Sequence, residues 1–287
     1  MTITYAIISS KVMSSTWVVI NLSLQFDKWF KAIPLRRSRR TYIFKTIEAE
    51  VFHSLNDVIA ELNQTYKGVR LLLVERSPDP IFVGAVGPYG KITGAPSFIA
   101  LVVNEQVDFR YEKGGYIAQG LVLETVDYGL STCWVGGYFN KEVAEQLIKV
   151  NDHERIIAIL PFGYARKNYS LTEKMMNQVG DYHKSKSIKE TVDGLPMEKW
   201  PKWIEKAIYS ANLAPSAYNR QSLRYVIEED HSITIRLDKP EEETNVPKGI
   251  DRGIAMLHIE LAVNQQGKKG IWEYSENLNT VTFKLNK

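Results

Sequence analysis

Cysteine is almost absent from this chain of 287 residues, which contains only Cys133. A single cysteine excludes an intramolecular disulfide framework, and the five histidines do not stand at metal-ligand spacing with it. We therefore expect a reducing, cytoplasmic environment and no structural metal.

Charge of one sign and long hydrophobic runs are also scarce. Lys and Arg total 36 and Asp and Glu total 33, so the net charge of +3 gives no polycation for nonspecific binding of nucleic acid. The apolar beginning of the chain contains no run longer than "WVVI", which is too short to span a bilayer, and it matches a signal peptide poorly. We expect residues 1–25 to be an extension outside the domain, with neither a membrane nor a nucleic acid as partner.

The familiar catalytic motifs are missing as well. The sequence has no G-x-S-x-G elbow, no H-E-x-x-H, no G-x-x-x-x-G-K-[ST] and no G-x-G-x-x-G after a strand. Cys133 lies in a segment that approaches the core, which favours a packed thiol over a nucleophile, and His258 on a helix is more typical of a satisfied side chain than of an acid or base. Any chemistry is therefore expected to come from a cofactor.

Apolar spacing predicts a regular order of helices and strands from Phe26 onward. Pro34 ends the first helix, Asn140 is suited to begin a later one, and Gly129 is a natural helix stop. A Gly-rich and Pro-rich stretch over 76–96 predicts a loop. Helices are predicted over 26–33, 47–65, 116–130 and 141–150, and strands over 69–75, 97–103 and 155–165.

The second half repeats this order in shortened form, with helices over 200–213 and 253–267 and a strand over 223–229. "VRLLLVE" and "LRYVIEE" each place an Arg near the start of an apolar strand that ends in Glu, and each later helix ends in a Gly followed five residues on by a Trp. These repeats indicate an internal duplication, a pseudo-dimer in one chain. We predict a first module over 26–170, a crossing segment over 171–195 and a second module over 196–287.

The segment "RRSRRTY" carries four arginines around a serine. In an extended segment Arg36, Ser38 and Arg40 project to one side, and two guanidinium groups around a hydroxyl suit a phosphate dianion. Arg37 and Arg39 would face elsewhere. A solvated charge run is the alternative, and a nucleic-acid anchor is less favoured because aromatic residues do not interleave with the basic run.

Two further segments stand out, "APSAYNRQ" over 214–221 and "GLSTCWVGGY" over 129–138. Alone, the first indicates only a helix stop and a turn. Together with "RRSRR" they resemble the FMN-dependent nitroreductase family, which has an R-x-S-x-R loop, an [AS]-P-S-x-x-N-x-Q turn and a G-[LI]-x-x-x-[WPF]-[VI]-[GE]-G-[FY] segment. The resemblance covers about residues 26–287. Here the A-P-S turn lies far from the arginine loop, which resembles the branch with two fused modules.

The resemblance implies an α+β fold with a mostly antiparallel central sheet flanked by helices. It also implies that the flavin contacts are divided between the modules, so that one chain, as a monomeric pseudo-dimer, builds one FMN site. By this likeness the FMN phosphate and ribitol would be held by Arg36, Ser38 and Arg40, with Arg166 as a further phosphate ligand. Lys91 would lie near the pyrimidine ring, Gly136 and Gly137 at flavin N5, and Pro215, Ser216 and Asn219 against the dimethylbenzene ring. Tyr89 and Tyr138 are candidates to flank a substrate.

The function implied is hydride transfer from NADH or NADPH through FMN to a small-molecule acceptor such as a nitroaromatic or a quinone. No side chain need act as an acid or base, because the flavin carries the hydride. A flavin-binding or redox-sensing module without turnover is the alternative, since the same residues would bind the flavin in both cases.

Overall fold

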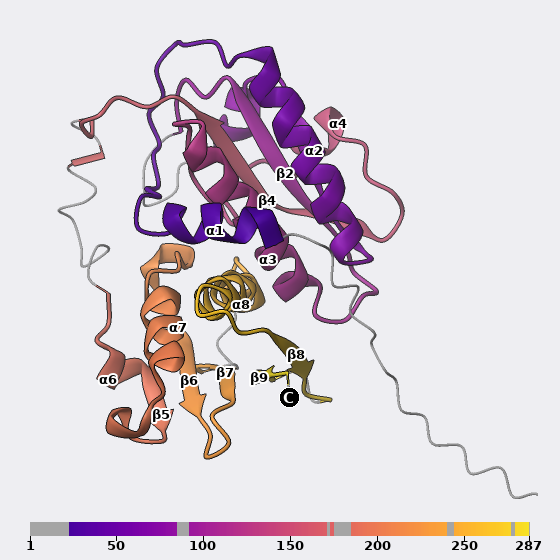
Figure 1. The fold of residues 1–287 in the computed structure, drawn as a ribbon. Coiled ribbons are helices and arrows are strands. Elements are labelled where there is room, and N and C mark those ends of the chain that lie inside the picture. Colours follow the sequence, from indigo (N-terminus) through magenta and orange to yellow (C-terminus); the bar gives the residue numbers. More distant parts are fainter. Residues whose placement is uncertain are drawn as a thin grey trace, which may run out of the picture.

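Two mostly antiparallel sheets, one in each half of the chain, organise the fold (Figure 1). The structure, a computed structural model, describes residues 23–84, 92–170, 173–174, 185–239, 244–276 and 279–286. Most of the expected N-terminal extension and the loop residue Lys91 therefore lie outside the described residues. No helix within the described part has both the length and the apolar character needed to cross a membrane.

The first half contains one four-stranded sheet with helices around it. Pro34 follows α1 and prevents its continuation, and the side chain of Asn140 caps α4 by accepting a hydrogen bond from the Val143 N–H at 3.0 Å. The elements are α1 (Ser23–Ala32), α2 (Ala49–Thr65), β1 (Val69–Val74), η1 (Asp79–Phe82), β2 (Ser97–Asn104), α3 (Arg110–Asp127), β3 (Ser131–Thr132), α4 (Lys141–Leu147) and β4 (Glu154–Gly163).

The second half contains a five-stranded sheet. Its strands are short and alternate between buried and more exposed residues, as in a sheet with one covered face. The elements are α6 (Ile188–Thr191), β5 (Val192–Gly194), η2 (Met197–Lys199), α7 (Lys202–Asn212), η3 (Ala217–Asn219), β6 (Leu223–Ile227), β7 (Ile233–Leu237), α8 (Lys248–Asn264), β8 (Gly270–Tyr274) and β9 (Thr280–Leu285).

The two sheets have the same strand order. The first runs β1-β2-β4-β3 and the second runs β6-β7-β9-β8, with every neighbouring pair antiparallel in both. The second sheet has one more strand, β5, which pairs in parallel with β6 at the outer edge. The predicted α+β class, with mostly antiparallel strands flanked by helices, is confirmed.

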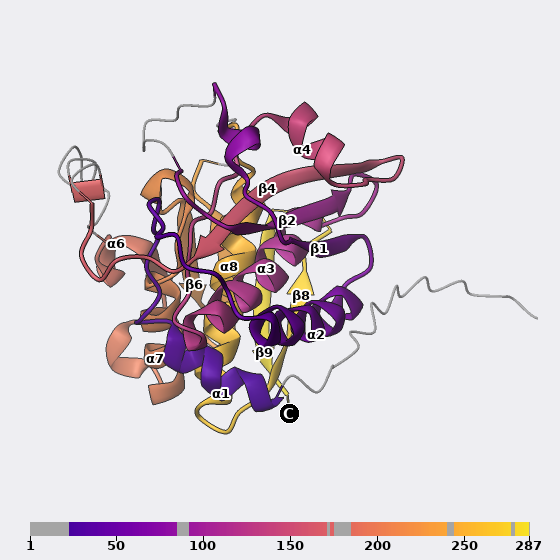
Figure 2. The same cartoon turned by 90° about the horizontal axis from the view of Figure 1, so that it is seen from above.

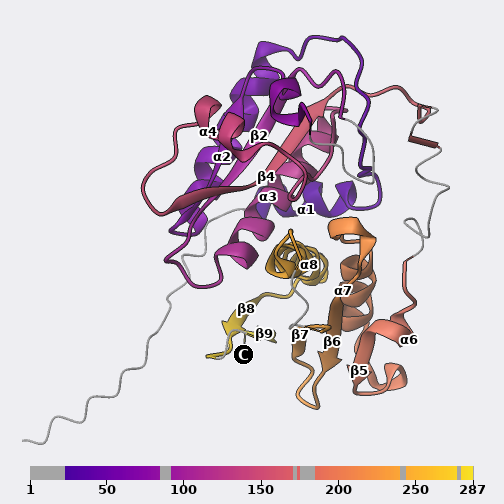
Figure 3. The same ribbon diagram turned by 180° about the vertical axis from the view of Figure 1, so that it is seen from behind.

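Helices α3 and α8 join the two halves. Helix α3 packs on the first sheet, α8 packs against the second half, and the two helices pack on each other (Figures 2 and 3). A Cβ on Gly115 would lie 2.3 Å from the Ile250 carbonyl oxygen, and a Cβ on Gly253 would lie 2.0 Å from the Glu112 carbonyl oxygen. Only glycine permits so close an approach of two helix backbones.

These two contacts are reciprocal. Gly115 and Gly253 are the same number of residues apart in the sequence as Glu112 and Ile250. Reciprocal contacts of this kind are what a two-fold axis produces in a symmetric dimer. The same separation relates Trp134 to Trp272. We call residues related by this separation counterparts.

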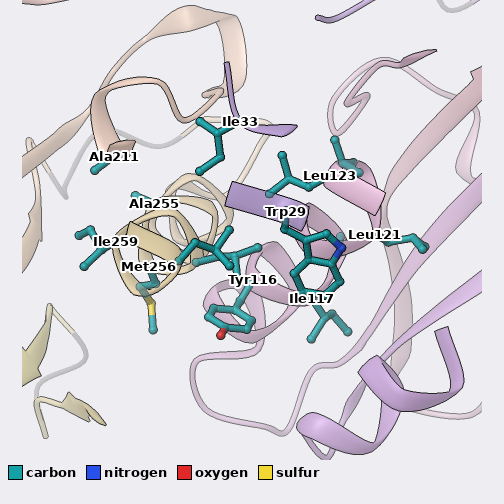
Figure 4. Close-up of a cluster of buried hydrophobic side chains, with 14 of the residues drawn as sticks. Trp29, Ile33, Tyr116, Ile117, Leu121, Leu123, Ala211, Ala255, Met256 and Ile259 are labelled. Atoms are coloured by element: carbon teal, nitrogen blue, oxygen red, sulfur yellow. The ribbon is translucent and has the colours of Figure 1, made fainter. Parts of the chain in front are cut away.

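One of the hydrophobic clusters formed by the described residues extends through both halves. Side chains from α1, α3, α7 and α8 meet in it, among them Trp29, Tyr116, Ala211 and Met256 (Figure 4). Trp29 is fully buried, and its indole N–H donates to Glu124 at 2.7 Å. Because the core is shared, each half leaves apolar surface uncovered without the other.

The outer edges of the two sheets are closed differently. Strand β5 covers β6, whereas the β1 edge is met by the side-chain amide of Asn63 in α2. Asn63 accepts from the Leu71 N–H at 2.7 Å and donates to the Leu71 carbonyl oxygen at 3.0 Å. One side chain thus satisfies both backbone groups that a neighbouring strand would pair.

Candidate functional site

The segment after α1 lies beside β3 in an extended conformation. Ser38 forms a parallel bridge with Thr132, and the Arg39 N–H donates to the Thr132 carbonyl oxygen at 3.0 Å. Tyr42 anchors the end of the segment, because its buried hydroxyl lies 2.8 Å from the Arg39 carbonyl oxygen and 2.9 Å from that of Pro161. This pairing fixes the alternation of side chains along residues 36–40.

Arg36 is a partly buried cation, with a buried Nε atom and without an acidic partner among the described residues. Its guanidinium donates to the Ser38 hydroxyl at 3.2 Å, and its Nε has no hydrogen-bond partner there. Burial, with a smaller contribution from the positive charge of Arg37, lowers the pKa of Arg36 to about 10. The group still carries its charge at neutral pH, and a partly buried charge of this kind favours a bound anion.

Arg39 points away from Arg36 and forms a buried ion pair. Its Nε donates to Glu173 at 3.0 Å, and Glu173 also accepts the Arg40 N–H at 2.9 Å and the Ser170 N–H at 2.8 Å. Burial opposes ionisation of Glu173, but the hydrogen bonds from Arg39 and these backbone groups outweigh it and lower the pKa to about 2. Arg39 and Glu173 therefore fasten the arginine segment to the chain beyond β4.

Arg166 contributes its backbone to this clamp, since its carbonyl oxygen accepts from Arg39 at 2.6 Å. The Arg166 side chain is exposed.

The positive charges of Arg36 and Arg40 both affect the pKa of Cys133, which immediately follows β3. Burial raises the pKa of the Cys133 thiol, and the positive charges of Arg40 and Arg36 only partly oppose this. The thiol is therefore protonated at neutral pH, as a packed cysteine would be. Its position shows that both arginines lie near the end of β3.

The chain beyond Cys133 leads to the glycine pair. Val135 exchanges two backbone hydrogen bonds with Ile159, at 3.0 and 2.9 Å, which holds the chain against β4. The N–H groups of Gly136 and Gly137 donate to no protein acceptor within the described residues. Both are available to an acceptor atom on a ligand.

Gly136 and Gly137 contact the second half of the chain. A Cβ on Gly136 would lie 3.0 Å from Val246, and a Cβ on Gly137 would lie 2.6 Å from both the Tyr218 hydroxyl and the Asn245 amide nitrogen. The Tyr218 hydroxyl donates to the Asn245 side-chain oxygen at 2.7 Å. The glycine pair is thus part of the boundary between the halves.

Aromatic rings from both halves meet at the same place. Tyr138 and Tyr218 stack edge to face, with ring centroids 6.2 Å apart, and Tyr138 is partly exposed.

The loop after α7 is held by a buried ion pair. The Arg220 Nε donates to Asp251 at 2.7 Å, and Asp251 also accepts the Ala217 N–H at 3.0 Å. Arg220 further donates to the Val246 carbonyl oxygen at 2.8 Å, so it links this loop to the start of α8. Burial raises the pKa of Asp251 to about 6, against the opposing charge of Arg220.

The same loop carries a cluster of left-handed backbone conformations. Tyr218, Asn219 and Gln221 have φ of 56°, 49° and 45°. Such conformations are uncommon outside glycine and persist where surrounding contacts impose them. Here the Ser216 hydroxyl accepts the Gln221 N–H at 3.0 Å, which helps to close the loop.

The structure brings the predicted residues to two ends of one segment. Arg36, Ser38 and Arg40 flank the end of β3, and Gly136 and Gly137 lie four residues further along with the 214–219 loop against them. Pro215 and Ser216 line a small pocket beside Asp251 on the second half. The candidates Lys91 and Tyr89 lie outside the described residues.

Sequence reasoning assigned no role to four residues that build this region: Arg39, Glu173, Arg220 and Asp251. Arg220 stands within the quoted "APSAYNRQ" segment, so an Arg inside a turn motif was a usable signal. Glu173 and Asp251 gave none, because their partners are distant in the sequence.

Comparisons with known proteins agree on one family. The family model described as "Putative TM nitroreductase" matches residues 28–263. A "putative nitroreductase" from Thermotoga maritima MSB8 has a similar structure, with a TM-score of 0.61 and 19% identity over 90% of this chain and 94% of that one. This likeness shows that the fold of both halves occurs together in another single chain.

Other solved structures match about half of the chain. A nitroreductase family protein from Clostridium novyi NT is 18% identical over 48% of this chain and 86% of its own, with a TM-score of 0.41. An FMN-dependent nitroreductase from Clostridium difficile R20291 is 17% identical over 56% of this chain and 99% of its own, with a TM-score of 0.40. A search of the curated proteins found no match.

Proposed function

Because the chain belongs to the nitroreductase family whose model it matches over residues 28–263, we propose that this oxidoreductase binds FMN and uses NADH or NADPH to reduce a small-molecule acceptor. When bound, FMN would supply the hydride chemistry, taking hydride from the nicotinamide and passing it to a quinone or nitroaromatic. The side chains described here would bind and orient the flavin.

The partly buried guanidinium of Arg36, with its buried Nε, carries this proposal. Its Nε has no partner among the described residues, it lies against the Ser38 hydroxyl, and a phosphate would satisfy it with charge-assisted hydrogen bonds. We propose that Arg40, beside the same strand end, adds a second positive charge to this phosphate site. The residues present therefore fit the phosphate of FMN.

The N–H groups of Gly136 and Gly137, which donate to no acceptor in the described part of the chain, suit the other end of the ligand. Without a Cβ, this backbone can approach a flat ring closely, and its N–H groups can donate to a ring nitrogen such as flavin N5. Pro215, Ser216 and Asn219 would pack on the dimethylbenzene side from the second half. Lys91 near the pyrimidine and Arg166 at the phosphate remain part of the proposal, and the Arg166 side chain is exposed.

We further propose one FMN for each chain, bound by a monomer that acts as a pseudo-dimer. The counterparts of Gly136 and Gly137 are Tyr274 and Ser275, and the Tyr274 ring packs on Phe109 with centroids 4.2 Å apart. A flavin ring could not approach the backbone where these side chains stand. The predicted module bounds, 26–170 and 196–287, belong to the same proposal.

Flavin binding and turnover test this proposal separately. The purified protein, stripped of ligand and titrated with FMN, should quench the flavin fluorescence to an end point of one FMN per chain. Anaerobic NADH or NADPH should then bleach the bound flavin, and a quinone should restore its absorption. Saturation at two FMN per chain would contradict the single site, and binding without bleaching by either nicotinamide would favour a redox-sensing module.

A further inference from the structure

A chain of hydrogen bonds runs from Trp134 in the first half, through α3 and α8, to α7 in the second half. The Trp134 indole N–H donates to the Gln119 side-chain oxygen at 3.2 Å. The Gln119 amide nitrogen lies 3.0 Å from His258 Nε2, and His258 Nδ1 lies 2.9 Å from the Ser210 carbonyl oxygen. Gln119 and His258 are fully buried, on α3 and α8.

The chemistry of the groups fixes every direction in this chain. The Ser210 carbonyl can only accept, so His258 Nδ1 carries the hydrogen and Nε2 of the neutral ring is an acceptor. The Gln119 NH2 must then donate to Nε2, which turns the Gln119 oxygen toward the Trp134 N–H. Burial lowers the pKa of His258 to about 4; the Ser210 carbonyl opposes this shift and the charge of Arg36 adds to it, so the ring is neutral at pH 7.

The counterpart tryptophan ends in a different group. The Trp272 indole donates to the Glu260 carboxyl at 3.1 Å, and the Tyr116 hydroxyl donates to the same Glu260 oxygen at 3.0 Å. Both tryptophans are therefore anchored to the central helix pair. Only the Trp134 chain passes through an amide and an imidazole to α7, and only Trp134 precedes a glycine pair.

Gly136 and Gly137 need such an anchor more than other residues would. Glycine has the greatest backbone freedom, and the two N–H groups make no hydrogen bond within the described residues that would orient them. The Trp134 indole, two residues earlier, packs against the cluster of Val246, Ile250 and Ile254 from the second half. A fixed indole limits the conformations open to the glycine backbone.

We propose that Gln119 and His258 are positioning residues that hold the Trp134 indole and thereby orient the backbone N–H groups of Gly136 and Gly137. This role rests on the proposed function, in which those N–H groups face the flavin ring. It assigns to the two central helices a part in setting the properties of the flavin.

The variant Gln119→Met tests the role, with Glu260→Met as its matched control. Each methionine fills a similar volume and leaves two buried polar groups without their partner, His258 and Trp134 in one case and Tyr116 and Trp272 in the other. Both variants should therefore lower the melting temperature. A merely structural role would predict similar effects of the two variants on everything else.

The first readout needs no flavin. Labelling with 15N-glycine and with tryptophan that carries 15N only at the indole nitrogen leaves 18 glycine amides and six indoles in the spectrum. Gln119→Met should move the Trp134 indole resonance and the amide resonances of Gly136 and Gly137, which Glu260→Met should leave in place. Unmoved Gly136 and Gly137 amides in Gln119→Met would overturn the proposal, whether or not the protein binds FMN.

The second readout uses bound FMN. Gln119→Met should weaken FMN binding roughly tenfold, the scale of one lost hydrogen bond, and shift the midpoint potential and visible spectrum of the flavin. Glu260→Met should change neither. Equal flavin properties in Gln119→Met and wild type, or an equal change in both variants, would contradict the positioning role. Failure of the wild type to bind FMN would instead remove the proposed function, and the glycine amides would still decide the positioning.

His258→Asn provides a milder variant if Gln119→Met folds poorly. Its amide can still donate to the Ser210 carbonyl, as His258 Nδ1 does, but it is too short to reach Gln119. The Gly136 and Gly137 amides should move in the same direction as in Gln119→Met, by a smaller amount. No movement of these amides in the folded His258→Asn variant would remove His258 from the positioning pair.

Discussion

The two halves share their strand order but differ in the residues that follow the counterpart tryptophans Trp134 and Trp272. In the first half Trp134 is followed by Val135 and the glycine pair, and in the second Trp272 is followed by Glu273, Tyr274 and Ser275. The backbone framework has been kept in both halves, while the glycine pair and the arginine segment stand only on the side of Trp134. The proposed function places the ligand on the side of Trp134, where the glycine backbone is open, and not on the side of Trp272, where Tyr274 and Ser275 carry side chains.

The largest expected effect is a loss of FMN affinity when Arg36 and Arg40, the cations that distinguish the first half, are removed. Arg36→Ala combined with Arg40→Ala removes charge-assisted hydrogen bonds worth about 1.5 to 3 kcal/mol each, so FMN affinity should fall by roughly 10²- to 10⁴-fold. Titration of the ligand-free protein with FMN measures this loss.

Arg37→Ala is the matched control for that experiment, because the exposed Arg37 side chain donates to the carbonyl oxygens of Pro34 and Arg36, at the surface of its own segment. It should bind FMN as the wild type does. An unchanged affinity in the folded double variant would show that Arg36 and Arg40 are not part of a flavin site.

The symmetry between the two halves can be tested where α3 crosses α8. Gly115→Ala and Gly253→Ala each place a Cβ within 2.3 Å of a backbone oxygen, so each should lower the free energy of unfolding by about 3 kcal/mol. The two losses should be similar because the contacts are reciprocal. Urea denaturation of both variants measures them.

Gly114→Ala is the control in the same helix. Its nearest neighbours would be the methyl groups of Leu101, at 3.2 and 3.3 Å, and a side chain can move more easily than a backbone. The expected loss is therefore smaller. Near-wild-type stability of Gly253→Ala with a large loss in Gly115→Ala would show that the crossing is not symmetric.

The clamp between Arg39 and Glu173 should make stability depend on pH. The folded pKa of Glu173 is about 2, below its unfolded value, so its contribution is complete above pH 4.5 and is lost as the pH falls from 4.5 toward 2. Its full size is about 3 kcal/mol at most. Glu173→Gln should lose most of this at pH 6 and should differ less from the wild type at pH 3.

Urea denaturation at both pH values measures this contribution, with Glu105→Gln as control, since Glu105 pairs at the surface with Arg155 at 3.5 Å. A constant difference between Glu173→Gln and wild type across this range would show that Glu173 is not ionised by the clamp.

The smallest expected effect on stability tests whether the ends of α3 and α8 are held in the same way. Gly129 and its counterpart Gly267 end α3 and α8 with φ of 68° and 66°, and a Cβ added at either position would have no atom of the described residues within 4 Å. Alanine at either position should cost about 1 kcal/mol through backbone strain alone. Thermal unfolding should give equal shifts, and a twofold difference would indicate that the two helix ends are held differently.

The sequence predicted the first-half elements well because their apolar periods are long. The helix predicted over 47–65 is observed as α2 over Ala49–Thr65, and the strand over 69–75 as β1. The helix predicted to begin at Tyr116 begins at Arg110, so the prediction missed its first two turns, which contain Gly114 and Gly115. In the fold Gly115 permits the close packing of α3 on α8 and Gly114 lies against Leu101 of β2, and this packing overrides their low helix propensity.

The second half shows the limits of periodicity. Strands β7, β8 and β9 were not identified, since five or six residues with alternating polarity give a weak signal until partner strands are known. The candidate site has the same limit. Arg36 and Ser38 could be paired from local alternation, whereas the bond between Arg39 and Glu173 spans 134 residues and depends on the fold.

The amide of Asn63 has a consequence for self-association. An open strand edge is a template for adding a strand from another molecule, which leads to aggregation or domain swapping. At Leu71 that template is blocked by one side chain, whereas β6 is protected by a whole strand. Loss of this single amide, by substitution or by chemical deamidation, would expose the apolar strand "VRLLLV" to edge-to-edge pairing while the rest of the fold stays intact.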